Sequence, residues 1–160
     1  MRKLLPIAAA IAAALTVTSL SPASAHNSPE KPKVFTVTTK TITEAQIDVG
    51  DPGPTLGDSN VITEDVYVAG KKVGTSDVNC VLVRLDPVTH KFAVSCLNTT
   101  VLPGGQITAQ GVVTSDEVEK VPFRQAITGG TGAYKGATGE LTVDEAGDGP
   151  AHLTFDLTRA

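Results

Sequence analysis

The fold is decided by the stretch VGTSDVNCVLVRLDPVTHKFAVSCLNTT, which occupies residues 73–100. Two runs rich in Val and Thr flank the tight connection Asp86–His90. Runs of this kind on either side of a short turn are typical of an antiparallel β-hairpin. A hairpin centred on that connection places Cys80 directly opposite Cys96, with both side chains on one face. The stretch therefore predicts two long strands and a facing pair of cysteines.

Outward from the hairpin, short β-rich runs alternate with turns rich in Gly and Pro along the rest of the chain. No window long enough for a helix shows apolar residues at helical spacing. The expected strands cover residues 34–43, 60–68, 73–85, 91–100, 106–114, 121–128, 137–145 and 151–157. The segments 48–58, 115–120 and 129–132 are expected to be a Pro- and Gly-rich loop, a charged loop and a glycine turn.

This pattern predicts an all-β protein whose eight antiparallel strands close into a single β-barrel. Short turns favour the pairing of each strand with the next, and closure removes the exposed strand edges. An eight-stranded barrel is just wide enough to enclose one small ligand. The capacity to hold a small molecule is the first indication of function.

The N-terminus carries the features of an export signal. Arg2 and Lys3 precede a short apolar run at 4–15, and a small-x-small pattern ends at Ala25. The expected division of the chain is a signal peptide at 1–25, a flexible leader at 26–33 and the barrel domain at 34–158. Retention of the first segment as an anchor is the alternative, although the apolar run is short for a membrane span.

Composition excludes several classes of partner. Loss of Arg2 and Lys3 with the signal peptide takes the formal charge from −4 to −6. A mildly acidic, secreted chain argues against nucleic acid as a partner, and no later segment is apolar enough to suggest a membrane helix. The three histidines, His26, His90 and His152, are isolated and show no metal-ligand spacing. We expect neither a metal nor a cofactor.

Cys80 and Cys96 are the only cysteines. An exported chain meets an oxidising compartment, where an even count fits one disulfide. Such a staple contributes on the order of 3 kcal/mol in the chain-entropy model. Two free buried thiols are the alternative. A redox-active pair is disfavoured because the spacing is unlike Cys-x-x-Cys.

The run AITGGTGAYKGATGE at residues 126–140 resembles the glycine-rich signature that dirigent proteins and allene oxide cyclases share. Three further segments are similar to the cyclase group, namely Gly57-Asp58 with Ile62–Tyr67, Val73–Val83 and Gly105–Gly111. The likeness spans roughly residues 34–157. It implies an allene oxide cyclase-like or dirigent-like barrel, as in bacterial members that carry signal peptides, but it does not fix a reaction.

The resemblance also implies where cyclase-type catalytic residues would lie. The plant cyclases place a Glu on the first strand, a Pro in the first loop, an Asn on the second strand, a Cys on the third and a Tyr on the fifth. Here the Cys matches Cys80, the Asn falls at or near Glu64, and the Tyr falls near Val113. The first strand offers Thr38, Thr39, Lys40 and Thr41 in place of the Glu, and Pro52 or Pro54 stands for the Pro. The sequence therefore argues against conversion of a fatty-acid allene oxide.

The candidate site residues follow from the inward direction of Cys80 that the resemblance implies. Strict alternation puts Val78, Leu82 and Arg84 on the same face as Cys80. The family match places Glu64 and Val113 in the interior as well. Glu64 and Arg84 are the candidate catalytic or ligand-orienting pair. The alternatives are that both lie at exposed strand ends or pair with each other as a structural bridge.

Three functions remain open from the sequence. The exported barrel holds a small lipophilic molecule and acts as an isomerase or cyclase by conformational templating. Alternatively, it is a non-catalytic ligand-binding or dirigent-like guide protein, or a structural barrel without a ligand. Whether the chain is an enzyme is thus left open. The apolar residues on both faces of segment 73–85 predict a surface for homo-oligomerisation.

Overall fold

The computed structural model describes residues 33–118, 122–144 and 150–159. The elements are β1 (Lys33–Ile47), β2 (Ser59–Val68), β3 (Lys71–Leu85), β4 (Phe92–Leu102), β5 (Gly105–Thr114), the short helix α1 (Ser115–Val118), β6 (Phe123–Gly130), the 3-10 helix η1 (Gly132–Tyr134), β7 (Thr138–Asp144) and β8 (His152–Arg159). The expected signal peptide and leader, up to residue 32, lie outside the described residues.

The eight strands form one closed antiparallel barrel in sequence order. The ring is completed where β1 pairs with β8, in a register that runs from Lys33 opposite Leu157 to Thr38 opposite His152. The expected all-β class, strand number and closure are therefore confirmed.

The hairpin of β3 and β4 has the expected register. Cys80 pairs with Cys96, and the two form a disulfide with their Cα atoms 4.0 Å apart. Cysteines that face one another across an antiparallel ladder lie close enough to form such a bond. The disulfide is therefore a cross-strand staple between β3 and β4, as expected.

Three local expectations are corrected by the structure. Residues 115–118 form the helix α1 rather than a charged loop, with the Glu117 carboxylate accepting the Thr114 backbone N–H at 2.8 Å. Gly129 and Gly130 continue β6 rather than forming a turn, which is made instead by η1. The first strand does not end at Thr43 but continues to Ile47.

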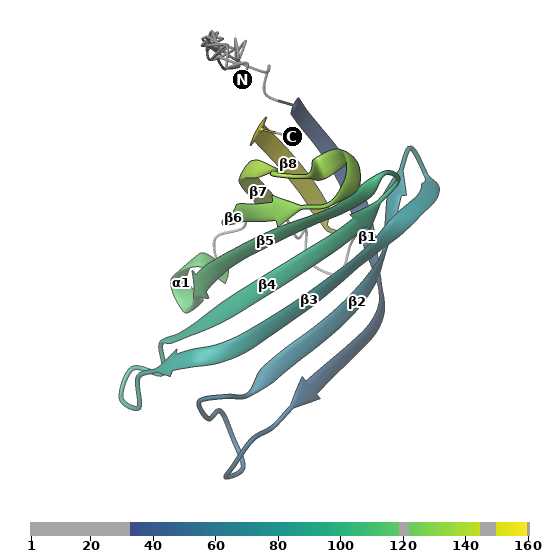
Figure 1. The fold of residues 1–160 in the computed structure, drawn as a ribbon. Coiled ribbons are helices and arrows are strands. Elements are labelled where there is room, and N and C mark those ends of the chain that lie inside the picture. The colour runs from purple at the N-terminus through teal and green to yellow at the C-terminus, as the bar shows by residue number, and fades with distance from the viewer. Residues whose placement is uncertain (1–32, 119–121, 145–149, 160) are drawn as a thin grey trace, which may run out of the picture.

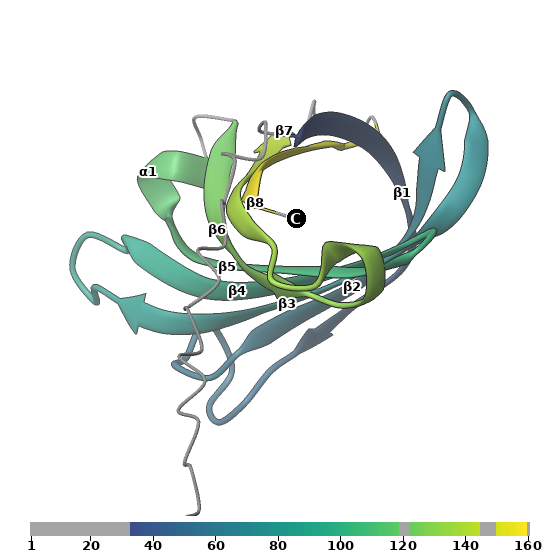
Figure 2. The ribbon, with the colours of Figure 1, turned by 45° about the horizontal axis from the view of Figure 1, so that its top comes forward.

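Unequal strand lengths divide the barrel into a closed end and an open end. β3 has 15 residues, whereas β6, β7 and β8 have 8, 7 and 8. The short strands complete the ring only at one end, and β2 to β5 continue beyond it as a curved sheet (Figures 1 and 2). β1 follows the same division, since it pairs with β8 up to Thr38 and with β2 from there to Ile47.

The hydrophobic core fills the closed end. Its buried members are Val37, Val66, Leu102, Ile107, Ala109, Ile127, Tyr134, Ala137, Leu141, Val143, Leu153, Phe155 and Leu157. Alternation along the strands supplies most of them, because every second side chain points into the ring, whereas Tyr134 lies in η1 and Ala137 between η1 and β7. Phe35 stacks on Phe155 with ring centroids 5.0 Å apart and also lies near Tyr134. The closed end thus contains the core that stabilises the fold, and the open end lies outside this core.

Glycines let the turn at η1 lie directly against the neighbouring β4–β5 turn. A Cβ atom added to Gly132 would lie 2.0 Å from the carbonyl oxygen of Gly104, and the φ of Gly132 is +60°. Both the contact and the dihedral angle favour glycine over any other residue. The glycine-rich run is therefore a structural feature of the closed end.

Candidate functional site

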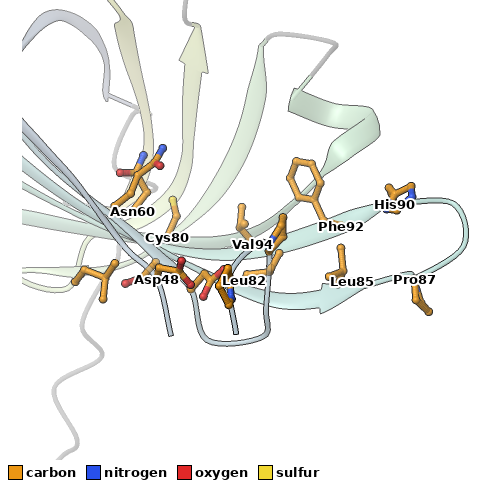
Figure 3. A pocket seen from close by; sticks show the side chains of 16 residues that line it. Asp48, Asn60, Cys80, Leu82, Leu85, Pro87, His90, Phe92 and Val94 are labelled. Atoms are coloured by element: carbon orange, nitrogen blue, oxygen red, sulfur yellow. The ribbon is translucent and has the colours of Figure 1, made fainter. Parts of the chain in front are cut away.

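A pocket of about 900 Å³ lies at the open end of the barrel (Figure 3). The described residues that line it are Gln46, Ile47, Asp48, Pro52, Gly53, Pro54, Asp58, Ser59, Asn60, Cys80, Leu82, Leu85, Pro87, His90, Phe92 and Val94. They come from the ends of β1 to β4 and from the two loops that join β1 to β2 and β3 to β4. The pocket therefore occupies the part of the sheet that the short strands do not cover.

Asp58 organises the long loop on one side of the pocket. Its carboxylate accepts the backbone N–H groups of Val49 at 2.9 Å and Thr55 at 2.8 Å, and the Thr55 hydroxyl at 2.9 Å. These backbone hydrogen bonds, that of Thr55 first, hold the pKa of Asp58 below its usual value. The loop is also fixed to β3, because the Leu82 N–H donates to the Asp58 carbonyl at 2.8 Å. An ionised carboxylate thus keeps this loop beside the pocket at neutral pH.

Asp86 plays the same part in the β3–β4 turn. It accepts the backbone N–H groups of Val88 at 2.8 Å and Thr89 at 2.9 Å. The bonds from Thr89 and then Val88 lower the pKa of Asp86. The turn also carries His90 in a left-handed conformation, with a φ of 56°. It therefore presents His90 at the rim of the pocket (Figure 3).

The body of the pocket wall is apolar. Leu82 and Leu85 come from β3, and Phe92 and Val94 come from β4. In Figure 3 the side chains of Cys80, Val94 and Phe92 point to the same side of the sheet. A wall of this kind binds the apolar body of a small molecule by removing it from water.

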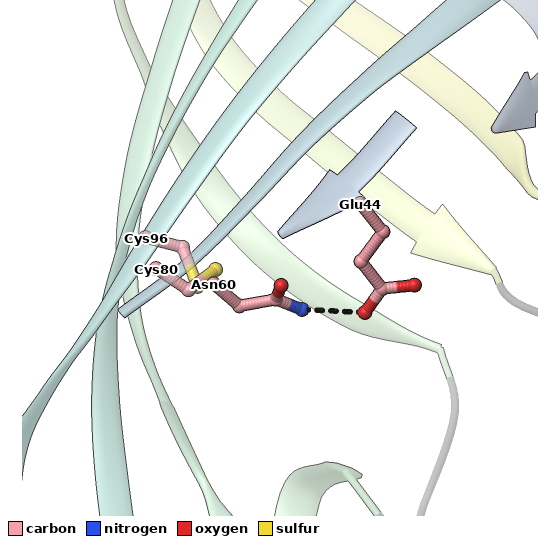
Figure 4. Close-up of a disulfide and its surroundings, with 4 residues drawn as sticks. All are labelled: Glu44, Asn60, Cys80 and Cys96. Carbon is pink, nitrogen blue, oxygen red and sulfur yellow. Dashed lines mark hydrogen bonds between the residues drawn. A yellow bond between two sulfur atoms is a disulfide. The ribbon is translucent and has the colours of Figure 1, made fainter. Parts of the chain in front are cut away.

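Asn60 and Glu44 add a polar pair next to the disulfide (Figure 4). The Asn60 Nδ2 donates to the Glu44 Oε1 at 2.9 Å. The Asn60 Oδ1 is buried and has no hydrogen-bond partner among the described residues. A buried carbonyl oxygen without a donor is costly, so this atom is suited to accept a bond from a ligand.

Leu82 is the one residue of the expected ligand set that lines the pocket itself. Val78 is half-buried and pairs with Ile62 and Asn98, one step deeper along β3 than Cys80. Val113 is buried opposite the lining residue Val94. Both therefore lie on the inner face of the barrel without lining this pocket.

Glu64 lies in the interior, as expected, but deeper than the pocket. It is 9% exposed, and its Oε1 accepts the hydroxyl of Thr39 at 2.8 Å. Ser76, which faces Glu64 in the β2–β3 register, is fully buried. Glu64 thus belongs to a buried polar layer between the core and the pocket, and its role in binding stays a prediction.

The expectation that Arg84 shares a face with Cys80 is wrong. The β3–β4 register shifts between Leu82 and Arg84, so that Leu82 pairs with Val94 whereas Arg84 pairs with Ala93. This β-bulge breaks the alternation of side chains, and Arg84 is exposed on the face opposite to the pocket. The structure therefore does not bring Glu64 and Arg84 together.

The polar groups that the sequence reasoning missed are Glu44 and Asn60. The sequence pattern predicts an end of the first strand at Thr43, and the resemblance sets the second-strand Asn at or near Glu64. The strand continues past Glu44, and the register sets Gln46 opposite Asn60 and Asn60 opposite Cys80. Pairing β2 with β3 residue by residue sets Asn60 opposite Cys80. This pairing is the signal that would have identified Asn60.

No group of three His, Cys, Asp or Glu side chains that could hold a metal occurs in the described part of the chain. Within the same residues, no helix is long and apolar enough to cross a membrane.

Comparison with known proteins gives one family and several similar structures. A family model described as "Allene oxide cyclase barrel like domain" matches residues 34–150. No curated protein matches the chain significantly.

Among solved structures, a pyocyanin demethylase is 30% identical, with a TM-score of 0.69, over 78% of this chain and 99% of that one. The Diels-Alderase AbmU from Streptomyces koyangensis is 13% identical, with a TM-score of 0.61, over 79% of this chain and 69% of that one. The pterocarpan synthase dirigent protein GePTS1 is 16% identical, with a TM-score of 0.58, over 90% and 96%. The two at lower identity show a shared fold.

Proposed function

The chain belongs to the allene oxide cyclase-like barrel family, and on that premise we propose that it binds one small, largely apolar molecule in the open-end pocket and templates its isomerisation or cyclisation. The observation that carries this proposal is the pocket itself. Its volume of about 900 Å³ lies within the ordinary range for small-molecule sites, roughly 300–1,000 Å³. Apolar walls with a few polar groups are the usual composition of such a site.

The proposed chemistry depends mainly on shape. A flexible molecule held against Leu82, Phe92 and Val94 is confined to few conformations, which favours ring closure or rearrangement. Asn60 would orient a polar group of the substrate through its free Oδ1. The Glu44 carboxylate, held by Asn60, is the proposed proton acceptor. The similarity to a pyocyanin demethylase supports a catalytic use of this barrel.

A second candidate is a protein that binds or guides a molecule without converting it. The disulfide favours this candidate, because the Cys80 sulfur lines the pocket but is bonded to Cys96 and is not available as a nucleophile or acid. The structural likeness to a dirigent protein is compatible with it, although at this identity that likeness concerns the fold.

The disulfide also supports the proposed location. A cross-strand disulfide persists in an oxidising compartment, as expected for a secreted protein whose signal peptide is cleaved after Ala25. On this proposal the mature chain begins at His26.

One experiment tests these proposals together. The protein is recovered from the medium of its own host, its N-terminal residue is determined, and native mass spectrometry detects any bound small molecule. A Val94→Trp variant fills the pocket, whereas Val34→Trp adds the same ring on the outside of the closed end, where Val34 is 60% exposed. We expect a ligand in the wild type and in Val34→Trp and none in Val94→Trp.

Incubation of the protein with the released ligand, or with host extract, separates the two candidates. Formation of an isomer of identical mass supports the catalytic function. Binding with thermal stabilisation but no new isomer supports the guide or carrier. Equal ligand content in both Trp variants, or no ligand in any sample, would contradict the assignment of this pocket as the site.

A further inference from the structure

The charge of the pocket restricts the ligand that it accepts. The described lining residues include the carboxylates of Asp48 and Asp58 but no Lys or Arg side chain. Glu44 adds a third carboxylate directly behind Asn60. His90 at the rim is the remaining titratable residue of that lining. The field inside the pocket is therefore negative, which attracts cations and repels anions.

The cationic side chains nearest in sequence do not compensate for this charge. Lys91 follows His90, but its Nζ lies 3.1 Å from a carboxylate oxygen of Asp116, with which it forms a salt bridge. Arg84 lies beyond the bulge on the face opposite to the pocket. Both positive charges are thus directed away from the space that a ligand would fill.

The hydrogen-bond acceptor of Asn60 favours the same kind of ligand as the negative charge of the pocket. The amide orientation is fixed, because rotation by half a turn would set its oxygen against the Glu44 carboxylate. One of the two Nδ2 hydrogens is used by Glu44, and the Oδ1 is the atom of this amide that is buried without a partner among the described residues. It is an acceptor, so it pairs with an N–H or O–H group and not with a carboxylate.

The apolar wall determines which uncharged body the ligand can have. Phe92 points into the pocket together with Val94 (Figure 3). An aromatic face binds planar rings and also attracts cations. A ligand that satisfies every group described here has a flat apolar body and a positively charged nitrogen that carries hydrogen.

We infer that this pocket selects an aromatic or polycyclic amine in its protonated form over carboxylate-bearing lipids of similar size. The inference rests on the proposed ligand-binding function of the same pocket and adds the chemical class of the ligand. Asn60 accepts the N–H group, Glu44 and Asp48 supply the field, and Phe92 with Val94 contacts the ring.

The test uses two probes with one apolar body and opposite charge, 2-naphthylmethylamine and 2-naphthoate. The chain contains no Trp, so naphthalene fluorescence can be followed with little protein background. At low ionic strength we expect the amine to bind at least about tenfold more tightly than the carboxylate. Raising the salt to about 0.5 M should reduce this ratio, because ions screen the field of the carboxylates.

A pair of matched variants locates the source of the preference. Glu44→Gln keeps an acceptor for Asn60 but removes one negative charge, and we expect it to lower the amine preference about threefold. Glu140→Gln changes the net charge equally, but Glu140 pairs with Arg124 on the outer face and should leave the preference unchanged.

The possible results separate the two proposals. Binding of the carboxylate as tightly as the amine, or an equal effect of both Gln variants, overturns the ligand class and leaves the pocket as a binding site. Absence of binding by either probe and by neutral 2-naphthylmethanol overturns the ligand class and the proposed function together.

Discussion

At the scale of single residues, the closed end depends on glycines that allow backbone segments to touch. Gly132 combines a left-handed φ with a position where a Cβ would overlap the Gly104 carbonyl. Gly136, four residues later, has a φ of +80° but nothing within 4 Å of an added Cβ. The two positions therefore separate the cost of the dihedral angle from the cost of contact.

We predict that Gly132→Ala lowers the free energy of unfolding by more than about 2 kcal/mol, because the turn at η1 must move away from the β4–β5 turn. Gly136→Ala should cost only about 1 kcal/mol, since it bears the strain of the dihedral angle alone. Urea unfolding monitored by circular dichroism measures both values. Equal losses at the two positions would show that the close contact has no energetic weight.

Single residues are also where prediction from sequence failed at the site. Strict alternation predicts that Arg84 shares a face with Cys80, but a bulge beside Arg84 reverses its face, and no residue type in that run marks the bulge. Glu44 was missed because Thr43 and Glu44 are consecutive polar residues, which interrupt the alternation that marks a strand, although β1 continues to Ile47. Leu82 was placed correctly because it lies before the bulge, within the regular register.

At the scale of elements, the β3–β4 hairpin joins the two ends of the barrel. The disulfide lies where the hairpin leaves the closed end and borders the pocket, with Cys80 in its lining and Cys96 almost fully buried. The disulfide therefore links β3 and β4 near the point beyond which the short strands β6, β7 and β8 no longer cover them.

We predict that the double variant Cys80→Ala with Cys96→Ala loses roughly 3 kcal/mol of unfolding free energy, the value expected for a closed loop of this length. Reduction of the wild-type protein should give a similar loss, which would attribute the effect to the bond and not to the side chains. Urea midpoints with and without reductant provide the measurement. A double variant as stable as the oxidised wild type would contradict a stabilising role.

The strands were predictable because runs that alternate Val and Thr between turns rich in Gly and Pro rarely form another secondary structure. The register of the β3–β4 hairpin followed from the position of one short turn. The helix α1 was not predictable, since four residues are too few to show a helical period. The full length of β1 was not predictable, because the alternation of polar and apolar residues changes phase at Thr43 and Glu44, next to the register shift between Thr41 and Thr43.

At the scale of the whole molecule, the outer face of β2 to β5 exposes apolar side chains. Val61, Leu97 and Val112 are 37%, 48% and 51% exposed. Their register places them on the face opposite to the disulfide, next to Val81. A patch of this kind on a sheet is typical of a surface that packs against another subunit.

We predict that the protein is a homo-oligomer and that Leu97→Lys dissociates it, because the charge would have to be buried at the contact. Val88→Lys is the control, since Val88 is 84% exposed in the β3–β4 turn and distant from the patch. Size-exclusion chromatography with light scattering gives the mass of each. A wild-type protein that is monomeric at high concentration, or a Leu97→Lys variant that stays assembled, would refute this prediction.

The unequal strand lengths have a consequence for how such a protein can change over generations. The segments at 48–58 and 86–91 border the pocket but contribute no side chain to the core cluster. Mutations there can alter the guest molecule without endangering the ring that keeps the chain folded. One ancestral scaffold can thus diversify at its mouth while its base stays the same, and grafting these two segments between relatives should transfer their preferences.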